Sequence, residues 1–313
     1  MNDLQVVFGT GPLALAVMRA LRAQGKPVRM INHSGRVRFA KDLDTQVGGI
    51  DATDPRQTRE VCEGAAAVFH CIGLPYAEWQ HLPAIAEGII AGAASANAPL
   101  VYGDNLYMYG KVSGPMHEEL PDAATTRKGR IRSAVAQRLL QAHREGQVKV
   151  AMGRGADFFG PHATNNAVMG SRVFGRALAG KPAQLLGNPD KLHTYTYVDD
   201  FARALVTLAQ RDDALGGIWH TPSAPAISSR QFVELVYRAA GRKPKLSAAP
   251  RLLVKVLGRF NAQMRELEEM LYQFDADFVM DSSRFEHTFG IRPTPLEDAI
   301  SATLAWFRAQ DAR

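Results

Sequence analysis

The sequence predicts an α/β fold in which a doubly wound parallel sheet is followed by a smaller, mostly helical domain. Short apolar runs alternate with helical patterns through the first half, a glycine-rich turn joins the first run to the first helix, and the alternation breaks down beyond residue 160. Strands separated by helices form crossovers that place parallel strands in one sheet with helices on both faces. The 313 residues, 46% of them hydrophobic, are enough for about two domains.

The first half contains the elements of the sheet in order. Apolar runs predict strands at residues 5–9, 27–32, 45–50, 66–73, 99–104 and 148–155. A helix is expected at 13–25, and a second, short helix within 53–64, where a cap residue, an early Pro and a closing Gly occur in order. A further helix is expected from about residue 131, where apolar residues repeat at helical spacing.

The second half is less regular. We expect a helix at about 167–180, a loop at 180–192, strands at 195–198 and 218–222, a helix opening at Asp199 or Asp200, and mostly helical sequence to the end. The basic segment 242–251 is expected to be a solvated linker. The predicted dinucleotide-binding domain spans 1–160 and is completed by about 193–222, and the predicted substrate domain spans 161–192 and 223–313.

Composition excludes several classes of protein. The net charge of +6 suits an anionic ligand, and because the basic residues are dispersed among acidic ones we expect no nucleic-acid binding. Cys62 and Cys71 form neither a disulfide framework nor a zinc pattern, and two separated histidines, His162 and His193, do not define a metal site, so we expect no metal. No apolar run approaches a membrane span and no signal peptide is recognised, which predicts a cytoplasmic protein with no membrane contact.

The segment VVFGTGPLA contains the pattern G-x-G-x-x-A between the first strand and the first helix. Gly9 permits a tight turn, Gly11 allows the backbone to approach a pyrophosphate, and Ala14 allows close packing of helix and sheet. The phosphates would lie against Gly9 and the residues that follow it, Thr10, Gly11, Pro12 and Leu13. An ordinary tight turn is the alternative, but this position in the chain favours a Rossmann dinucleotide-binding domain.

The end of the second strand bears on the choice of cofactor. A carboxylate there would bind the ribose 2′-hydroxyl of NAD and repel the 2′-phosphate of NADP. This chain has Asn32, Ser34 and Arg36 instead, and the last two can donate hydrogen bonds to a phosphate. A solvated basic loop is the alternative. The pattern favours NADP, with NAD as the less favoured cofactor.

Several segments, in this order and spacing, resemble the extended short-chain dehydrogenase/reductase family, which includes NAD(P)-dependent epimerases and dehydratases. The matching segments are GIDATD (49–54), HCIG (70–73), NLYMYG (105–110), RGADFFGP (154–161), YVDD (197–200), DSSR (281–284) and TPL (294–296). The resemblance runs nearly end to end and includes the family's G-x-G-x-x-A variant. It implies cofactor contacts from the adenine-binding turn at Asp51 and Ala52, and from Ile72 and Gly73 beside the cofactor.

The same resemblance exposes a departure from the family. Its members carry Y-G-x-x-K about twenty residues after an S-x-x-V-Y-G segment, whereas here Lys128 stands at the tyrosine position, Arg132 at the lysine position and Asn105 at the serine position. Arg132 could retain contact with the nicotinamide ribose but cannot donate a proton.

Lys128 or Tyr107 could be the acid instead. We expect strand alternation to place Tyr107 on the same side as Asn105. The candidate catalytic residues are Asn105, Tyr107, Lys128 and Arg132. Four cations in TRKGRIR lie where a helix begins, a position that disfavours cations unless a negative charge compensates them. Since Lys128 and Arg132 hold the register of the family's catalytic pair and a dinucleotide would supply that charge, we expect these two to point into the cofactor cleft, and Arg127 and Arg130 to be solvated.

Two functions remain open. The first is an NADP-dependent oxidoreductase, epimerase or dehydratase that acts on an unidentified small molecule with a replaced Tyr/Lys pair. The second is a non-catalytic NADP-binding redox sensor or regulatory protein, which the replaced residues favour. A small-molecule substrate is the expected partner, and a homodimer is left open, since the sequence does not fix the oligomeric state.

Overall fold

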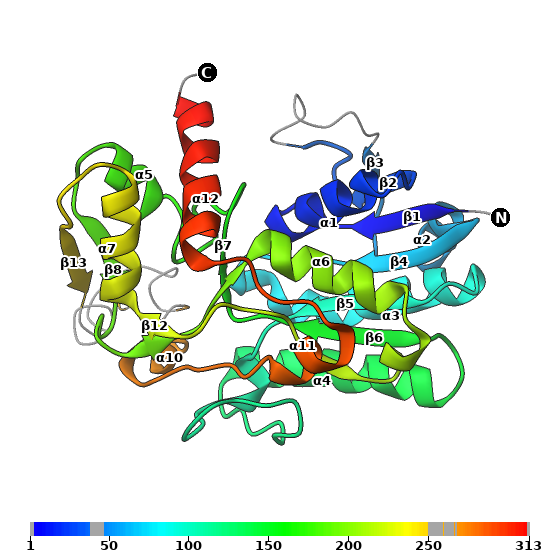
Figure 1. Cartoon of the computed structure of the whole chain (residues 1–313). Helices are drawn as coiled ribbons and strands as arrows, with labels where there is room; N and C mark the ends of the chain where they lie inside the picture. The colour runs from blue at the N-terminus through cyan, green and yellow to red at the C-terminus, as the bar shows by residue number, and fades with distance from the viewer. Residues whose placement is uncertain (1–2, 38–46, 250–258, 260–265, 267, 312–313) are drawn as a thin grey trace. The chain divides into compact units, whose positions relative to one another are not determined.

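The computed structural model describes residues 3–37, 47–249, 259, 266 and 268–311, and its chain divides into two compact units (Figure 1). The first unit comprises Met1–Met108, Arg127–Arg154 and Phe201–Trp219, and the second comprises Tyr109–Thr126, Gly155–Asp200 and His220–Arg313. These boundaries differ from the predicted ones, because residues 109–126, 155–160, 193–200 and 220–222 belong to the second unit. The assignment of one part to the cofactor and the other to the substrate stays a prediction.

The first unit is built on a seven-stranded sheet with the strand order β11-β6-β5-β4-β1-β2-β3. The strands are β1 (Leu4–Phe8), β2 (Val28–Asn32), β3 (Val47–Gly49), β4 (Ala65–His70), β5 (Leu100–Asp104), β6 (Val150–Arg154) and β11 (Ile218–His220). All neighbours from β3 to β6 pair in parallel, which confirms the predicted doubly wound α/β class. The order reverses between β1 and β4, and ligands of such sheets bind at the carboxyl ends of the strands near that point.

Helices cover both faces of this sheet (Figure 1). They are α1 (Pro12–Ala23), α2 (Pro55–Cys62), α3 (Leu82–Ser95), α4 (Arg127–Arg144) and α6 (Val198–Ala209). Figure 1 shows α1 and α6 on one face and α3 and α4 on the other. Gly103 in β5 lets both helices of the first face approach, since a Cβ there would lie 2.7 Å from the Leu13 side chain and 3.2 Å from that of Leu205. The expected short helix is confirmed as α2, capped by the Asp54 side chain, which accepts from the Arg56 N–H.

The second unit combines three two-stranded sheets with helices. Its pairs are β7 (Asp157–Phe159) with β10 (Tyr195–Tyr197), β8 (Ala183–Leu186) with β13 (Leu246–Ala249), and β9 (Leu192–His193) with β12 (Ile227–Ser228). Its helices are α5 (Phe174–Leu178), α7 (Ser229–Ala239), α10 (Tyr272–Asp275), α11 (Ser283–Phe289) and α12 (Leu296–Asp311). An aromatic core holds α5, α7 and α12 together, in which Phe174 stacks on Phe307 and Phe232 meets Phe159 edge to face.

Three expectations for this half were wrong. The helix at 167–180 is reduced to α5, because the preceding residues form turns, one of them closed by the Val173 N–H on the Gly170 carbonyl. The expected loop at 180–192 contains β8, and the expected solvated linker at 242–251 contains β13, which pairs with it in parallel. Each strand has only four residues and finds its partner about sixty residues away, so periodicity could not reveal the pair.

The helix expected from residue 131 begins four residues earlier, at Arg127. Residues 45–46 of the expected third strand lie outside the described residues. Over the described part of the chain, no helix has the length and apolar character needed to span a membrane.

Candidate functional site

The turn between β1 and α1 has the backbone geometry of a phosphate site. Gly9 has φ +114°, and a Cβ added there would lie 2.7 Å from the carbonyl oxygen of Cys71, so only glycine fits. A Cβ on Gly11 would meet no atom within 4 Å, which leaves the space beside this residue open. Gly11 is also the N-cap of α1, where no side chain caps the helix. The N–H groups of the first helical turn are therefore available to an anion, and the turn fits a pyrophosphate.

A cavity of about 580 Å³ adjoins this turn at the carboxyl ends of the parallel strands. Eight of the predicted cofactor residues line it: Gly9, Thr10, Gly11, Asn32, Asp51, Ala52, Ile72 and Gly73. The cavity is thus formed by the segments in which the glycine pattern and the family resemblance placed the cofactor. The other predicted residues, Pro12, Leu13, Ser34, Arg36 and Arg132, are not among those that line it. The cofactor contacts of all of them stay predictions.

Sequence reasoning missed part of the cavity wall. His33 follows β2, between two residues that were singled out, and Glu78 and His81 come from the 3-10 helix η2 (Tyr76–His81). No motif marks η2, so its presence at the cavity follows only from the path of the chain after β4. These three side chains are exposed and add titratable groups to a wall that is otherwise largely apolar or backbone.

The floor of the cavity carries an ionised carboxylate. Asp51 Oδ1 accepts from the Thr53 hydroxyl at 2.7 Å and from the Thr53 N–H at 2.9 Å. These two bonds, with a smaller contribution from His33, lower the pKa of Asp51. The adenine-binding turn expected at 49–54 therefore has a fixed acceptor facing the same cavity as the phosphate turn.

The expected strand geometry at Asn105 and Tyr107 was wrong. The strand β5 ends at Asp104, and Tyr107 opens the 3-10 helix η3 (Tyr107–Tyr109). The Asn105 side-chain carbonyl accepts from the Tyr107 N–H at 3.0 Å, which turns the chain out of the strand. Asn competes with strand bonding in this way, so alternation does not relate the two side chains.

The four cations of TRKGRIR are divided between interior and solvent. Lys128 is 0% exposed and Arg132 is 7% exposed, whereas Arg127 and Arg130 are exposed. Lys128 and Arg132 are thus turned away from solvent, but neither lines the cavity beside the phosphate turn, and their place in a cofactor cleft stays a prediction. The Lys128 ammonium lies 4.9 Å from the centre of the Tyr76 ring, and the Arg132 guanidinium lies 4.5 Å from the centre of a Trp79 ring. Aromatic faces therefore stabilise two cations at a helix N-terminus that would otherwise disfavour them.

Arg132 also belongs to a buried ion network. Its Nη1 donates to the Tyr102 hydroxyl at 2.6 Å and to Asp104 Oδ1 at 3.3 Å. Arg154 Nε lies 3.5 Å from the other oxygen of Asp104, so one buried carboxylate lies between two arginines. Burial lowers the pKa of Arg132, but attraction to Tyr102 and Asp104 outweighs this effect and raises it. Arg132 is held from the side of β5, and the ribose contact implied by the resemblance stays a prediction.

Two tyrosine hydroxyls meet beside these cations. The Tyr76 and Tyr107 hydroxyl oxygens lie 2.9 Å apart, and Trp79 stacks on Tyr107 at 5.8 Å while meeting Tyr76 edge to face at 5.1 Å. Tyr107 is 8% exposed and Tyr76 is half-buried, so the pair connects the interior with a more accessible position. Sequence reasoning missed Tyr76 and Trp79, since neither lies in a recognisable motif. A phenol pair beside two cations can exchange a proton.

His70, at the end of β4, completes this region. It is 0% exposed, its ring lies 4.8 Å from that of Tyr102, and burial followed by the nearby charge of Arg132 lowers its pKa to about 3. The Ile72 N–H points at its Nδ1 at 3.4 Å, so the neutral ring carries its proton on Nε2. Within the described residues this Nε2 has no hydrogen-bond partner.

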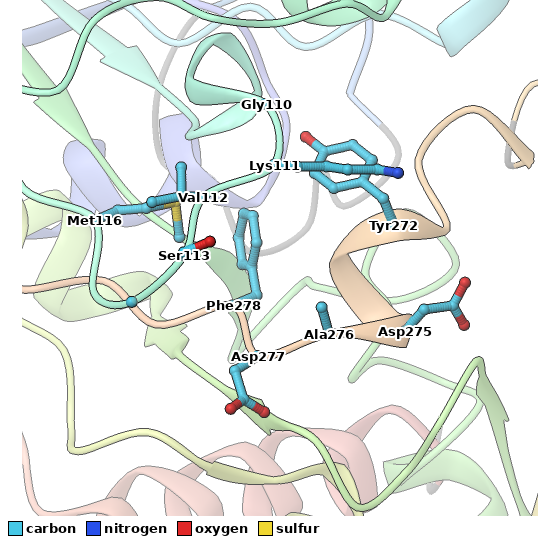
Figure 2. Close-up of a pocket in the computed structure, with 11 residues that line it drawn as sticks. Gly110, Lys111, Val112, Ser113, Met116, Tyr272, Asp275, Ala276, Asp277 and Phe278 are labelled. Atoms are coloured by element: carbon cyan, nitrogen blue, oxygen red, sulfur yellow. The ribbon is translucent and has the colours of Figure 1, made fainter.

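The second unit has its own small cavity, of about 290 Å³, between the loop at 110–116 and the segment at 272–278 (Figure 2). Lys111, Ser113 and Asp277 give this cavity both charge signs and a hydroxyl. Elsewhere in the unit, His193 Nε2 lies 3.0 Å from Asp157 Oδ2, and the imidazole stacks on Tyr195. His162 packs on Trp306. No group of three or more potential metal ligands occurs among the described residues, and the absence of a metal stays a prediction.

Comparisons with known proteins agree with this geometry. A family model described as the NAD dependent epimerase/dehydratase family matches residues 6–219. The fold is similar to UDP-N-acetylglucosamine 4-epimerase from Bacillus cereus, at 17% identity and a TM-score of 0.79, over 97% of this chain and 96% of that one. It is also similar to Thermus thermophilus UDP-glucose 4-epimerase in complex with NAD, at 17% identity and a TM-score of 0.80, over 97% of this chain and 99% of that one.

A third similar structure is dTDP-glucose 4,6-dehydratase from Streptomyces venezuelae with NAD and TYD bound, at 16% identity and a TM-score of 0.79, over 99% of this chain and 98% of that one. At these identities the likeness concerns the fold alone. A sequence comparison with curated proteins finds no match.

Proposed function

This chain belongs to the NAD-dependent epimerase/dehydratase family, and from that membership we propose that it is an NADP-dependent enzyme. It carries out oxidoreduction, epimerisation or dehydration of a small molecule with a replaced Tyr/Lys pair. Sugar nucleotides are the first substrates to test, since the similar solved structures are epimerases and a dehydratase of such compounds. When bound, the cofactor supplies hydride transfer, and the chain supplies binding, orientation and proton transfer.

The observation that carries this proposal is the cavity over the phosphate turn. Gly9, Gly11 and the uncapped start of α1 fit a pyrophosphate, and Asp51 lies in the wall where the adenine would bind. The NADP preference rests on the absence of a carboxylate at the end of β2. Isothermal titration with NADPH and NADH tests it: tighter NADPH binding is expected, whereas equal affinities or a preference for NADH would contradict it.

For the proton donor we propose Tyr107, with its hydroxyl bonded to that of Tyr76. The positive charge of Arg132 acts on Tyr107 and would stabilise a phenolate left after proton donation. Lys128, the other candidate acid, lies against the Tyr76 ring, where its charge supports the same pair. Asn105 has its carbonyl committed to the chain turn, which leaves its amide N–H groups to bind a substrate oxygen.

Turnover of UDP-glucose or dTDP-glucose, followed by product analysis, separates the two acids. Tyr107→Phe should reduce kcat by about 10²-fold or more, in keeping with the loss of a general acid. Lys128→Met should retain part of the activity, since it removes a charge that only supports the pair. Activity that survives Tyr107→Phe but disappears in Lys128→Met would assign the proton to Lys128.

A second candidate function is a non-catalytic NADP-binding sensor. It is favoured by the contacts of Arg132, which Tyr102, Asp104 and Trp79 hold in the interior at the position of the family's lysine. Tight NADPH binding without turnover of any sugar nucleotide, combined with a change in proteolytic susceptibility between the NADPH and NADP⁺ forms, would support the sensor over the enzyme.

A further inference from the structure

Asn32 occupies the position at which a ribose-binding carboxylate is expected, but its side chain makes hydrogen bonds within the protein. Its Nδ2 donates to the Thr10 hydroxyl at 2.9 Å and to the Arg36 carbonyl at 2.7 Å, and its Oδ1 accepts from the Gly35 N–H at 2.7 Å. An amide group has two N–H donors, and both are occupied. The side chain therefore joins the phosphate turn, through Thr10, to the loop that follows β2.

The neighbouring residue lines the same cavity with a side chain for which no hydrogen bond within the protein is described. His33 is exposed, lines the cavity beside Asn32, and its charge acts on the Asp51 carboxylate across the same wall. Ser34 and Arg36, which the sequence singled out, are not among the lining residues. Ser34 Oγ is turned back on its own loop, where it accepts from the Arg36 N–H at 3.3 Å.

We propose that two tasks, usually combined in one residue, are divided here between Asn32 and His33. Asn32 is a positioning residue that fixes the ribose loop to the phosphate turn, and the His33 imidazole donates a hydrogen bond to the 2′-phosphate of the adenosine ribose. The proposal rests on the NADP dependence proposed above. It explains how a chain with no carboxylate at the end of β2 can still hold that loop rigidly: three hydrogen bonds of a neutral amide replace the carboxylate without repelling a phosphate.

The His33 part is tested by titration calorimetry with NADPH, NADH, 2′,5′-ADP and 5′-AMP. His33→Ala should weaken NADPH and 2′,5′-ADP by about tenfold, as expected for one lost hydrogen bond to a charged group, and leave NADH and 5′-AMP within about twofold. His33→Arg should restore the two phosphorylated ligands. Arg56→Ala, an exposed arginine on α2 that does not line the cavity, is the matched control.

Arg36→Ala provides the competing outcome. If it causes the selective loss and His33→Ala does not, the 2′-phosphate is bound by Arg36 and the proposal is overturned. The same holds if His33→Ala weakens all four ligands equally. Because His33 is exposed, its variants should keep the thermal unfolding temperature of the wild type, which is checked in the same samples.

The Asn32 part has a different signature. Asn32→Ala should weaken NADPH and NADH by a similar factor, about fivefold, and leave their ratio unchanged, because a positioning residue acts on both. Thr10→Val removes the acceptor of one Asn32 bond while keeping side-chain volume, and the double variant should be no weaker than the weaker single variant. A ratio that changes more than about threefold in Asn32→Ala would mean that Asn32 itself contacts the 2′ substituent.

Failure of this inference is distinguishable from failure of the proposed function. A wild-type protein that prefers NADH contradicts the NADP dependence and, with it, the His33 contact. The positioning role of Asn32 is still tested in that case, by whether Asn32→Ala weakens both cofactors by a similar factor. A wild-type preference for NADPH that no His33 variant alters keeps the proposed function and overturns the His33 contact alone.

Discussion

The phosphate turn and the start of α4, two regions of the first unit, form their candidate sites by different means. At the turn, the features that matter belong to the backbone: the positive φ of Gly9, the open space beside Gly11 and the uncapped N–H groups of α1. At the start of α4, side chains from several segments form the site, since Lys128 and Arg132 depend on Tyr76, Trp79 and Asp104.

This difference decides which substitutions each region can accept. A backbone site tolerates almost any neighbouring side chain but no Cβ at Gly9. A side-chain site can be rebuilt when its partners change together, because each charge needs only a compensating group within reach. The variants that follow test this contrast, beginning with the largest expected effect.

Arg132→Met should cost about 3–5 kcal/mol of unfolding free energy, because it removes one partner of a buried ion pair and leaves the Asp104 carboxylate with a single arginine. Urea unfolding followed by circular dichroism measures this. Arg130→Ala, an exposed neighbour on the same helix, should change stability by less than about 0.5 kcal/mol. Equal effects of the two variants would mean that burial in this network carries no energetic weight.

Gly9→Ala should cost about 2–3 kcal/mol, because alanine is strained at φ +114° and its Cβ would lie 2.7 Å from a backbone oxygen. Gly11→Ala has neither problem and should change stability by less than about 1 kcal/mol while weakening NADPH, whose phosphates need the open space. Unfolding curves and calorimetry on both variants sharpen the contrast. Unchanged NADPH affinity in Gly11→Ala would contradict the proposal that this turn binds the phosphates.

His70 should make the fold sensitive to acid. Because burial and Arg132 lower its pKa to about 3 in the folded state, the unfolded chain takes up a proton below pH 6.5 that the folded chain does not. The stabilisation is complete above pH 6.5 and is lost as pH falls towards 3, about 2 kcal/mol of it by pH 5. His70→Asn should flatten this part of the curve of unfolding free energy against pH. An unchanged slope would contradict the assignment.

The smallest expected effect concerns the phenol pair. Tyr76→Phe and Tyr107→Phe should each cost about 1 kcal/mol, and the double variant should cost less than the sum, by about 0.5–1.5 kcal/mol, since the two hydroxyls bond to each other. A double-mutant cycle from urea unfolding measures this coupling. Strict additivity would show that the hydroxyls do not interact, which would also weaken the proposed proton donor.

The sequence predicted the first unit far better than the second. Helices lie between β1 and β2 and between each pair of successive strands from β3 to β6, so local periodicity and the glycine turn were sufficient for most of this sheet. The β8–β13 pair joins segments about sixty residues apart, and no local signal encodes such a partner. The helix expected at 167–180 was wrong for a related reason, because Gly170 and the preceding asparagines favour turns that only tertiary contacts select.

The candidate site was predictable to the extent that motifs mark it. Eight predicted residues line the cavity because the segments that carry them directly follow strands β1 to β4 or end one of them, at the carboxyl edge of the sheet. Tyr76, Trp79 and His33 could not be found in this way. Their positions depend on where η2 and the loop after β2 run in space, and aromatic residues near a strand end are most often core. The burial of Lys128 was predictable from two signals together: its register with the family's tyrosine and the unfavourable position of a cation at a helix N-terminus.

The carboxylate shared by Arg132 and Arg154 has a consequence for how such a chain can change over time. The double change Lys128→Tyr and Arg132→Lys would not give a well-held tyrosine–lysine pair at this helix, because lysine cannot reproduce the guanidinium contacts to Tyr102, Asp104 and Trp79. Substituting Asp104 first would leave two buried arginines without their shared carboxylate. Substituting Arg132 first would lower the free energy of unfolding by several kcal/mol. Each of these single changes therefore begins with a destabilised protein, so the side chains of this network can be exchanged only several at a time.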